Sequence, residues 1–329
     1  MIGRLGAFLS EIAAPSREGV FNVRRLEDGS AFYAGRDSRG HAAVLIATSD
    51  AGRTVPLRLA GIEATFATPY QIVEPGTAPT IQTLTAVVCT NTDENVVAYF
   101  ASVMESLLPL FGDRPSAERV AKAVRQIVDL FQRLRRPARR SVVGLVGELS
   151  VIDAASDVST AVRSWRTDPD DRFDFGIGKV RLDVKASSHR HRMHDISFEQ
   201  ANPPEGSMGL VASIWIEAMA GGTALAELVR AIETKLAGRG EEIIKLRTLI
   251  AETLGDTLPQ AMTWCFDEQL ATDSLRYFYT SEIPAIRPPL PDGVSSARFT
   301  SDLSRCTPLE LALLAQNLNG TERGLLPRS

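Results

Sequence analysis

The first part of the chain alternates apolar and polar residues in short segments. Runs such as Ala42–Ile46 and Ile81–Val88 are separated by turn-forming stretches, for example Gly35–Gly40. Several short strands at this spacing are typical of a small antiparallel β domain. We therefore predict a β-rich N-terminal domain over residues 1–92, and we identify no catalytic constellation in it.

The pattern becomes helical after residue 92. Apolar residues recur every three or four positions from Val96 to Leu108 and again from Val120 to Leu134. This spacing places them on one face of a helix, which is then buried. The two segments predict a helical connector over residues 93–140.

Residues 141–329 combine helical and extended patterns. We predict a buried helix around 142–152, a hairpin within 173–186, a strand at 209–216 and one or two amphipathic helices between 223 and 254. This order predicts an α/β domain with a mixed central sheet flanked by helices. A C-terminal extension of mixed pattern follows it.

The segment Lys179–Ala186 separates its apolar and charged residues onto two faces. Alternate residues of an extended chain share a face, so Asp183 and Lys185 point away from the side that Leu182 and Val184 occupy. The apolar face is suited to a core. The other face presents an acid beside an amine.

A second acid precedes this strand. If residues 178–179 form the two-residue turn that places glycine first, Ile177 pairs with Val180 and Asp174 lies opposite Asp183. Like charges that face each other across a strand pair repel, and a divalent cation between them removes the repulsion. The hairpin therefore predicts a site for magnesium, or manganese, held by carboxylate oxygens.

These residues resemble the signature of a known superfamily. Asp174, a spacer of eight residues and then Asp183-Val184-Lys185 are similar to the split Asp…(Asp/Glu)-x-Lys motif of the PD-(D/E)xK nucleases. The sequence departs from the motif in two places. Phe173 stands where the motif has proline, and the second acid is aspartate in place of glutamate.

The resemblance implies a restriction-endonuclease-like core of helix, three strands, helix and strand, and hydrolysis of DNA with magnesium. Glu148 matches a glutamate that many members carry on a preceding helix, and Gln200 lies where some members keep a glutamine near the site. The implied catalytic residues are Glu148, Asp174, Asp183, Lys185 and Gln200. The implied ligands of magnesium or manganese are Asp174, Asp183 and Glu148.

The wider context from Gly144 to Gln200 looks like a bacterial family of PD-(D/E)xK proteins associated with restriction and phage-defence gene clusters, with a fainter match at Gly35-Arg36-Asp37. That likeness implies cleavage of foreign DNA together with other defence-system proteins. The chain has no Walker-type glycine-rich loop, so any ATP dependence would come from a partner ATPase. A homodimer is compatible with this interpretation.

Composition limits the location of the protein and its DNA-contacting surface. The 329 residues carry a formal net charge of −4, so phosphate binding requires a local basic patch. We expect Arg190 and Arg192, which follow the hairpin, to contact DNA, and Arg133–Arg140 is either a second such patch or a solvated helix end.

The chain lacks a membrane-spanning apolar run and a signal peptide, so we expect a cytoplasmic protein with no membrane partner.

Other interpretations stay open at this point. The segment His189–His194 is interpreted as an exposed edge or loop rather than a metal site, because carboxylates suffice for a hard cation. A catalytically silent DNA-binding or scaffolding subunit would keep the fold without the activity. A third alternative is an interaction module with an accidental Asp-Val-Lys, which close approach of Glu148, Asp174, Asp183 and Lys185 would remove.

Overall fold

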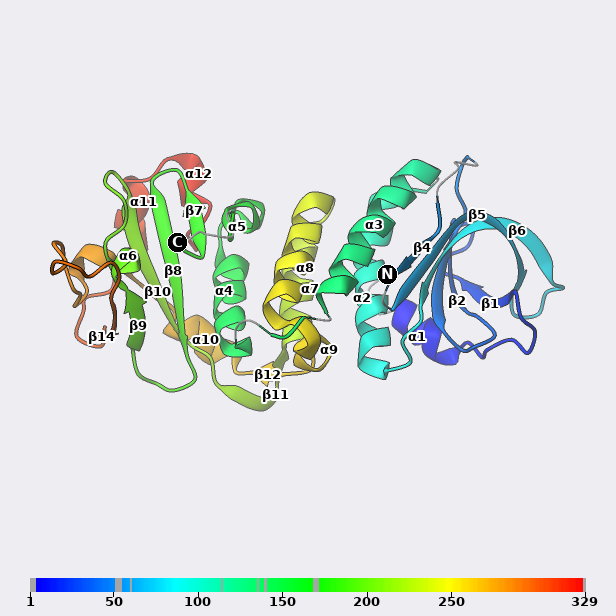
Figure 1. Ribbon diagram of the computed structural model, residues 1–329, viewed down its shortest axis with the longest axis horizontal. Coiled ribbons are helices and arrows are strands. Elements are labelled where there is room, and N and C mark those ends of the chain that lie inside the picture. Colours follow the sequence, from blue (N-terminus) through cyan, green and yellow to red (C-terminus); the bar gives the residue numbers. More distant parts are fainter. Residues whose placement is uncertain are drawn as a thin grey trace. The chain divides into compact units, whose positions relative to one another are not determined.

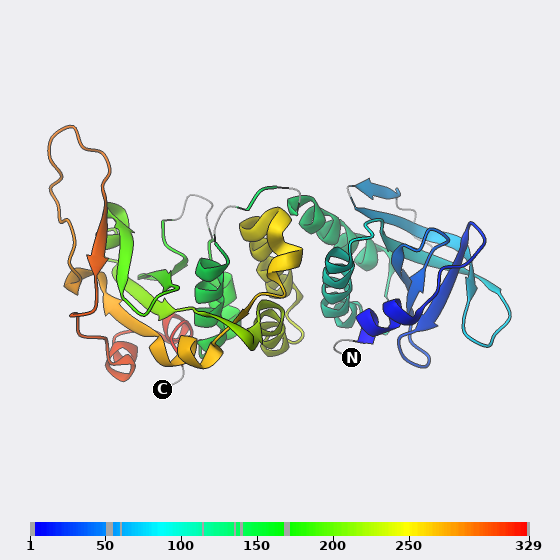
Figure 2. The same ribbon diagram turned by 90° about the horizontal axis from the view of Figure 1, so that it is seen from below.

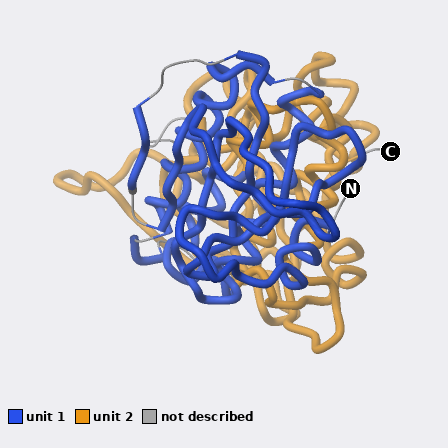
Figure 3. Tube along the Cα trace, turned by 90° about the vertical axis from the view of Figure 1, so that its right-hand side faces the viewer, with its two compact units in different colours: residues 1–138, 247–260 blue, residues 139–246, 261–329 orange. Residues whose placement is uncertain are grey.

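The structure is a computed structural model that describes residues 4–50, 55–59, 61–113, 115–134, 136–138, 141–167 and 172–327. The chain divides into two units, which Figure 3 colours blue and orange. The first unit contains residues 1–138 and 247–260, and the second contains residues 139–246 and 261–329. The boundaries expected from the sequence (1–92, 93–140 and 141–329) stay a prediction.

The first unit is built on a strongly curved sheet (Figure 1). Its strands follow the order β1-β2-β3-β6-β5-β4, and a parallel pairing of β1 with β5 closes five of them into a barrel-like sheet. The strands are β1 (Val20–Arg25), β2 (Phe32–Arg36), β3 (Ala42–Ile46), β4 (Leu57–Leu59), β5 (Ile62–Val73) and β6 (Thr80–Cys89). The predicted β-rich N-terminal part is confirmed.

Apolar side chains fill this barrel, among them Val23, Leu45 and Leu84. Helices α1 (Arg4–Glu11), α2 (Glu94–Phe111) and α3 (Ala117–Arg133) accompany it. Asp93 begins α2 by accepting hydrogen bonds from the backbone of the first turn, and this bond pattern is the usual N-cap of a helix. The two helices predicted between 93 and 140 are therefore present.

The second unit contains a mixed sheet in the order β13-β10-β8-β7. Its strands are β7 (Phe175–Ile177), β8 (Val180–Ser187), β10 (Met208–Trp215) and β13 (Arg276–Tyr279). Strand β8 is antiparallel to β7 and parallel to β10, and β10 is antiparallel to β13. The predicted mixed α/β architecture is confirmed.

Helix α4 (Val142–Ala154) packs on this sheet and is the buried helix predicted from the sequence. Gly147 makes the close packing possible, because a Cβ there would lie 2.8 Å from the Cβ of Ala186 and 3.2 Å from Cγ2 of Ile214. Strand β9 (Met193–Ser197) leaves the main sheet and pairs with β14 (Arg298–Asp302), which lies beside it in Figure 2.

The remaining elements complete the second unit and the segment that returns to the first. They are α5 (Val158–Ser164), α6 (Phe198–Ala201), β11 (Ala218–Ala224), α7 (Leu225–Lys235), α8 (Gly240–Leu254), η1 (Gly255–Thr257), α9 (Leu258–Ala261), β12 (Cys265–Phe266), α10 (Glu268–Ser274), η2 (Thr280–Glu282), α11 (Leu311–Gln316) and α12 (Gly320–Arg323). Helices α7 and α8 are the amphipathic helices expected between 223 and 254. No helix of the described residues has the length and apolar character needed to cross a membrane.

Candidate active site

The β7–β8 hairpin has the register predicted from the sequence. Ile177 pairs with Val180, so continuing the register brings Asp174 opposite Asp183. Gly178 begins the turn with a φ of 51°, a left-handed conformation that glycine adopts without strain. The two-residue turn thus determines which acids meet across the hairpin.

Both aspartates are buried, and each has a defined partner. Asp174 is 6% exposed, and its Oδ2 accepts a hydrogen bond from the backbone N–H of Val184 at 2.9 Å. Asp183 is 3% exposed, and its Oδ2 lies 2.9 Å from Nζ of Lys185. Acid and amine of the Asp-Val-Lys segment therefore form an ion pair at the core of the sheet.

Gln200 links the members of this ion pair. Its Nε2 donates to Oδ1 of Asp183 at 2.7 Å, and its Oε1 accepts from Nζ of Lys185 at 3.1 Å. The side chain is oriented by a capping box at the start of α6, in which Ser197 and Gln200 bond reciprocally. A helix cap thus places an amide against both functional groups of β8.

Glu148 lies on α4 and is 3% exposed. Its two carboxylate oxygens have separate donors. Nε1 of Trp165 donates to Oε2 and Nη2 of Arg166 donates to Oε1, both at 2.6 Å. Charge-assisted bonds of this length fix the carboxylate firmly.

The backbone carries Arg166 to this position in a left-handed conformation. Its φ is 43°, which is unfavourable for a residue with a side chain and persists where surrounding contacts enforce it. Its N–H donates to the backbone oxygen of Asp174 at 2.8 Å, and the preceding Trp165 pairs with Phe175. The residues that hold Glu148 are thereby joined to the start of the hairpin.

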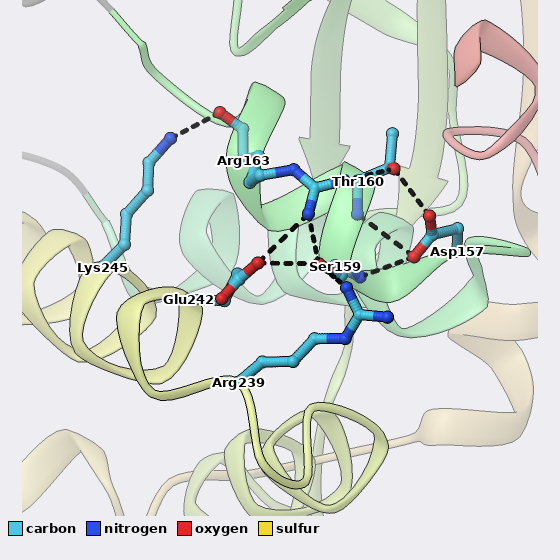
Figure 4. A network of polar contacts seen from close by, with 7 residues as sticks. All are labelled: Asp157, Ser159, Thr160, Arg163, Arg239, Glu242 and Lys245. Atoms are coloured by element: carbon cyan, nitrogen blue, oxygen red, sulfur yellow. Dashed lines mark hydrogen bonds and ion pairs between the residues drawn. The ribbon is translucent and has the colours of Figure 1, made fainter.

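A polar network anchors the short helix α5 that precedes Trp165 (Figure 4). Arg163 and Arg239 each donate to Oγ of Ser159 at 2.8 Å, and Ser159 donates to Glu242 at 2.9 Å. The network contains Asp157, Ser159, Thr160, Arg163, Arg239, Glu242 and Lys245. It ties α5 to the beginning of α8 and so supports the position of Trp165 and Arg166.

Two of the buried carboxylates, Asp183 and Glu148, have raised pKa values. Burial raises the pKa of Asp183 to about 7, the neighbouring Asp174 adds to the rise, and Lys185 opposes it. Burial and then Asp174 likewise raise the pKa of Glu148 to about 7, against the effect of Arg166. Glu148, Asp174 and Asp183 are therefore close enough to interact electrostatically, and the group favours additional positive charge.

The donor set suits a hard divalent cation. Oδ2 of Asp183 is buried and accepts no hydrogen bond among the described residues, apart from its ion pair with Lys185. Magnesium takes one or two carboxylates and completes its shell with water and substrate phosphate, which matches Asp174 and Asp183. Within the described ranges, no group of three or more His, Cys, Asp or Glu side chains is arranged to hold a metal, and Glu148 is engaged by Trp165 and Arg166.

Comparison with protein families identifies the family of the chain. A family described as "Putative PD-(D/E)XK family member, (DUF4420)" has a model that matches residues 8–304. The chain belongs to this family. The match includes the barrel-like sheet of the first unit as well as the β7–β8 hairpin of the second. Comparisons with curated proteins and with solved structures found no match.

The arginines expected to contact DNA in this PD-(D/E)XK family member have partners within the protein. Nε and Nη2 of Arg190 donate to the two oxygens of Glu217 at 2.9 and 3.1 Å. Arg192 is half-buried and donates to Ser213 and to the backbone oxygen of Ser274. Their role in phosphate contact stays a prediction.

The other basic and histidine-containing segments are placed as follows. Arg133 pairs with Glu252, whereas Arg135, Arg139 and Arg140 of the same run lie outside the described residues. His194 is buried, its Nε2 lies 2.7 Å from Oγ of Ser213, and burial lowers its pKa to about 4. His194 is therefore neutral near pH 7.

Sequence reasoning did not identify Trp165 and Arg166 as parts of the site. Trp165 is fully buried, and its indole N–H donates to Glu148. No motif marks Arg166. The available signal was Glu148 itself, because a buried carboxylate requires a cation or donor partner.

Proposed function

We propose that this family member is a divalent-metal-dependent DNA endonuclease. The observation that carries the proposal is the convergence of Asp174, Asp183 and Lys185 on one hairpin, with Gln200 bonded to both Asp183 and Lys185. Membership of a PD-(D/E)XK family supports a nuclease-like fold. We assign the second unit, with α4 and the β7–β8–β10 sheet, to a restriction-endonuclease-like core.

Each residue has a proposed role. Asp174 and Asp183 hold magnesium or manganese, which would polarise the phosphate and activate water. Lys185 stabilises negative charge that develops on the phosphate as the water oxygen bonds to phosphorus and the leaving oxygen departs. Gln200 holds the carboxylate of Asp183 and the ammonium group of Lys185 in position through its hydrogen bonds to both.

Glu148 has a less direct role in this proposal. Both of its oxygens already accept hydrogen bonds, so direct coordination requires one donor to be displaced. We propose that Glu148 orients water next to the metal or becomes a ligand when Arg166 moves. A carboxylate fixed by two donors is suited to positioning, because it does not reorganise during the reaction.

The proposed context is a bacterial restriction or phage-defence system. DNA is the proposed substrate, and other defence proteins, an ATPase among them, are proposed partners. The engaged state of Glu148 favours one alternative, a catalytically silent subunit that binds DNA within such a complex. Cleavage separates the two, since a silent subunit binds DNA without cutting it.

The decisive assay incubates the full chain with plasmid DNA, methylated and unmethylated, in magnesium, manganese or EDTA. We expect cleavage with either metal and none in EDTA. Asp183→Asn should lower the rate by roughly a hundredfold, because it removes a charged ligand. Asp195→Asn, which alters an exposed β9 aspartate bonded to Thr300, is the matched control and should cut at the wild-type rate. Binding without metal-dependent cutting, with all partners present, would favour the silent subunit.

A further inference from the structure

An open cavity of about 580 Å³ lies beside the proposed active site. Its lining includes Arg172, Phe173, Ile177, Arg181, Glu199 and Pro204. Three lining residues are chain neighbours of active-site residues: Phe173 precedes Asp174, Glu199 precedes Gln200, and Arg181 lies two positions before Asp183 on β8. The cavity therefore continues from the active site towards the start of β8.

Arg181 and Asp183 share the face of β8 that carries the chemistry. Residues two apart on a strand are separated by roughly 7 Å, and one strand of duplex DNA advances 3.4 Å per nucleotide along the helix axis. A phosphate at Arg181 would thus lie within a few nucleotides of one at Asp183. The cavity has the size of typical small-ligand pockets, roughly 300–1,000 Å³.

Among the described residues that line the cavity, the charged side chains sum to one positive charge. Arg172 and Arg181 are opposed by Glu199, which pairs with Arg172 at 3.0 Å. Arg181 uses Nη1 to donate to the backbone oxygens of Gly178 and Val180. Among the described residues its other guanidinium nitrogens have no hydrogen-bond or ion-pair partner. Arg190 and Arg192 follow the opposite end of β8, and their guanidinium nitrogens donate to other side chains and to backbone oxygens.

We infer that this cavity is a nucleotide subsite of the proposed nuclease, in which one nucleotide of the cleaved strand places its phosphate against Arg181 and its sugar and base against Phe173, Ile177 and Pro204. The inference rests on the proposed function for its substrate class. It assigns the DNA path to the start of β8, whereas the sequence favoured the arginines beyond its end. Glu199 limits binding in this subsite, because its carboxylate neutralises Arg172 and repels phosphate.

The test measures binding of a fluorescein-labelled DNA duplex to the full chain by anisotropy, in EDTA and over a range of salt concentrations. Arg181→Gln should weaken binding on the order of tenfold at low salt and reduce the salt slope by about one. Arg181→Lys should retain most of the slope. Glu199→Gln should tighten binding roughly threefold, since it releases Arg172.

Arg276→Gln is the matched control. Arg276 lies on β13 of the same sheet and, like Arg181, donates through Nη1 to nearby backbone oxygens, those of Asp273 and Leu275, but it does not line the cavity. It should bind DNA like the wild type. An equal loss in Arg276→Gln, wild-type binding by Arg181→Gln or weaker binding by Glu199→Gln would overturn the subsite.

A second measurement separates a nucleotide subsite from a simple phosphate site. Saturation-transfer NMR with deoxyadenosine monophosphate should show contact with the base protons in the wild type and its loss in Arg181→Gln. Contact that persists in Arg181→Gln, or no base contact in the wild type, contradicts the subsite.

Failure of the subsite and failure of the nuclease activity are distinguishable. DNA binding in EDTA requires no cleavage. If the wild type does not cut DNA but the Arg181 and Glu199 variants change its binding as expected, the subsite is supported and the nuclease activity is refuted. Metal-dependent cutting by Arg181→Gln at the wild-type rate and affinity would refute the subsite alone.

Discussion

Strand β3 of the first unit and strand β8 of the second are both interior strands of their sheets, yet they bury different side chains. All five residues of β3, Ala42–Ile46, are apolar and buried. Strand β8 buries Asp183 and keeps Lys185 largely covered, at 16% side-chain exposure. Burying an ion pair contributes little to stability compared with apolar packing. A strand under selection only for stability would resemble β3, and the charges of β8 are consistent with the proposed active site.

The cores of the two units also differ in the polar side chains that they bury. The barrel core is formed by apolar strand residues such as Val23 and Ile72. In the second unit, Glu148 and Asp183 are buried and depend on Arg166 and Lys185. The two units thus predict different responses to mutation: loss of packing in the first and loss of charge compensation or activity in the second.

The largest expected effect is on activity. Lys185→Ala should reduce DNA cleavage roughly a hundredfold, equivalent to about 3 kcal/mol of barrier, because a positive group next to the reacting phosphate is lost. DNA affinity should change little. Lys179→Ala removes an exposed lysine of the same hairpin, whose Nζ donates to a backbone oxygen, and should cut normally. Wild-type cutting by Lys185→Ala would mean that Lys185 has no catalytic role.

The next effect concerns stability in the second unit. Arg166→Gln leaves Glu148 buried without its cation, and removal of one partner of a buried pair costs about 3 kcal/mol. Urea unfolding of the second unit measures this loss in the free energy of unfolding. Arg190→Gln breaks the exposed pair with Glu217 and should cause no measurable change, since exposed pairs contribute little. Equal unfolding midpoints for both variants would show that Glu148 does not depend on Arg166.

A pH effect follows from His194. Its pKa falls from 6.5 to about 4 on folding, so between these values the unfolded chain binds the proton and the folded chain does not. The part of the folding stability that is linked to His194 is fully present above pH 6.5. It declines as the pH falls towards 4, by at most about 3 kcal/mol. His194→Gln should flatten this part of the profile, whereas His191→Gln, at an exposed position, should keep the wild-type slope. A wild-type slope in His194→Gln would refute the assignment.

The smallest effect compares one glycine from each unit. In β2, a Cβ at Gly35 would lie 2.8 Å from Cδ1 of Leu45, and at Gly147 it would lie 2.8 Å from the Cβ of Ala186. Each alanine substitution should destabilise its unit by roughly 1–2 kcal/mol through overpacking. Only Gly147→Ala should also lower the cleavage rate of the folded protein, because Glu148 is its neighbour. A rate loss in Gly35→Ala would show that the barrel contributes to catalysis.

The hairpin was predictable because its determinants are local. The alternation around Asp183 and the turn at 178–179 fix the register, and the observed pairing of Ile177 with Val180 follows. The buried helix containing Glu148 was likewise evident from its apolar run. These features depend on residues within a few positions of one another.

The partners of Glu148 were not predictable, because they depend on tertiary structure. Arg166 reaches Glu148 through a left-handed backbone at φ 43° and through the network that holds α5. Arg192 turns inward to Ser213 and Ser274, which no local pattern indicates. Sequence spacing places charges on an element, whereas the packing of other elements decides whether they face solvent.

The central claim is that Asp174 and Asp183 hold a divalent cation beside Lys185. Anomalous diffraction from crystals of the full chain soaked in manganese chloride tests it most directly. We expect one strong peak at roughly 2 Å from a carboxylate oxygen of each aspartate, and its loss in Asp183→Asn. Manganese bound only elsewhere, in a protein that cuts DNA with that metal, would contradict the account.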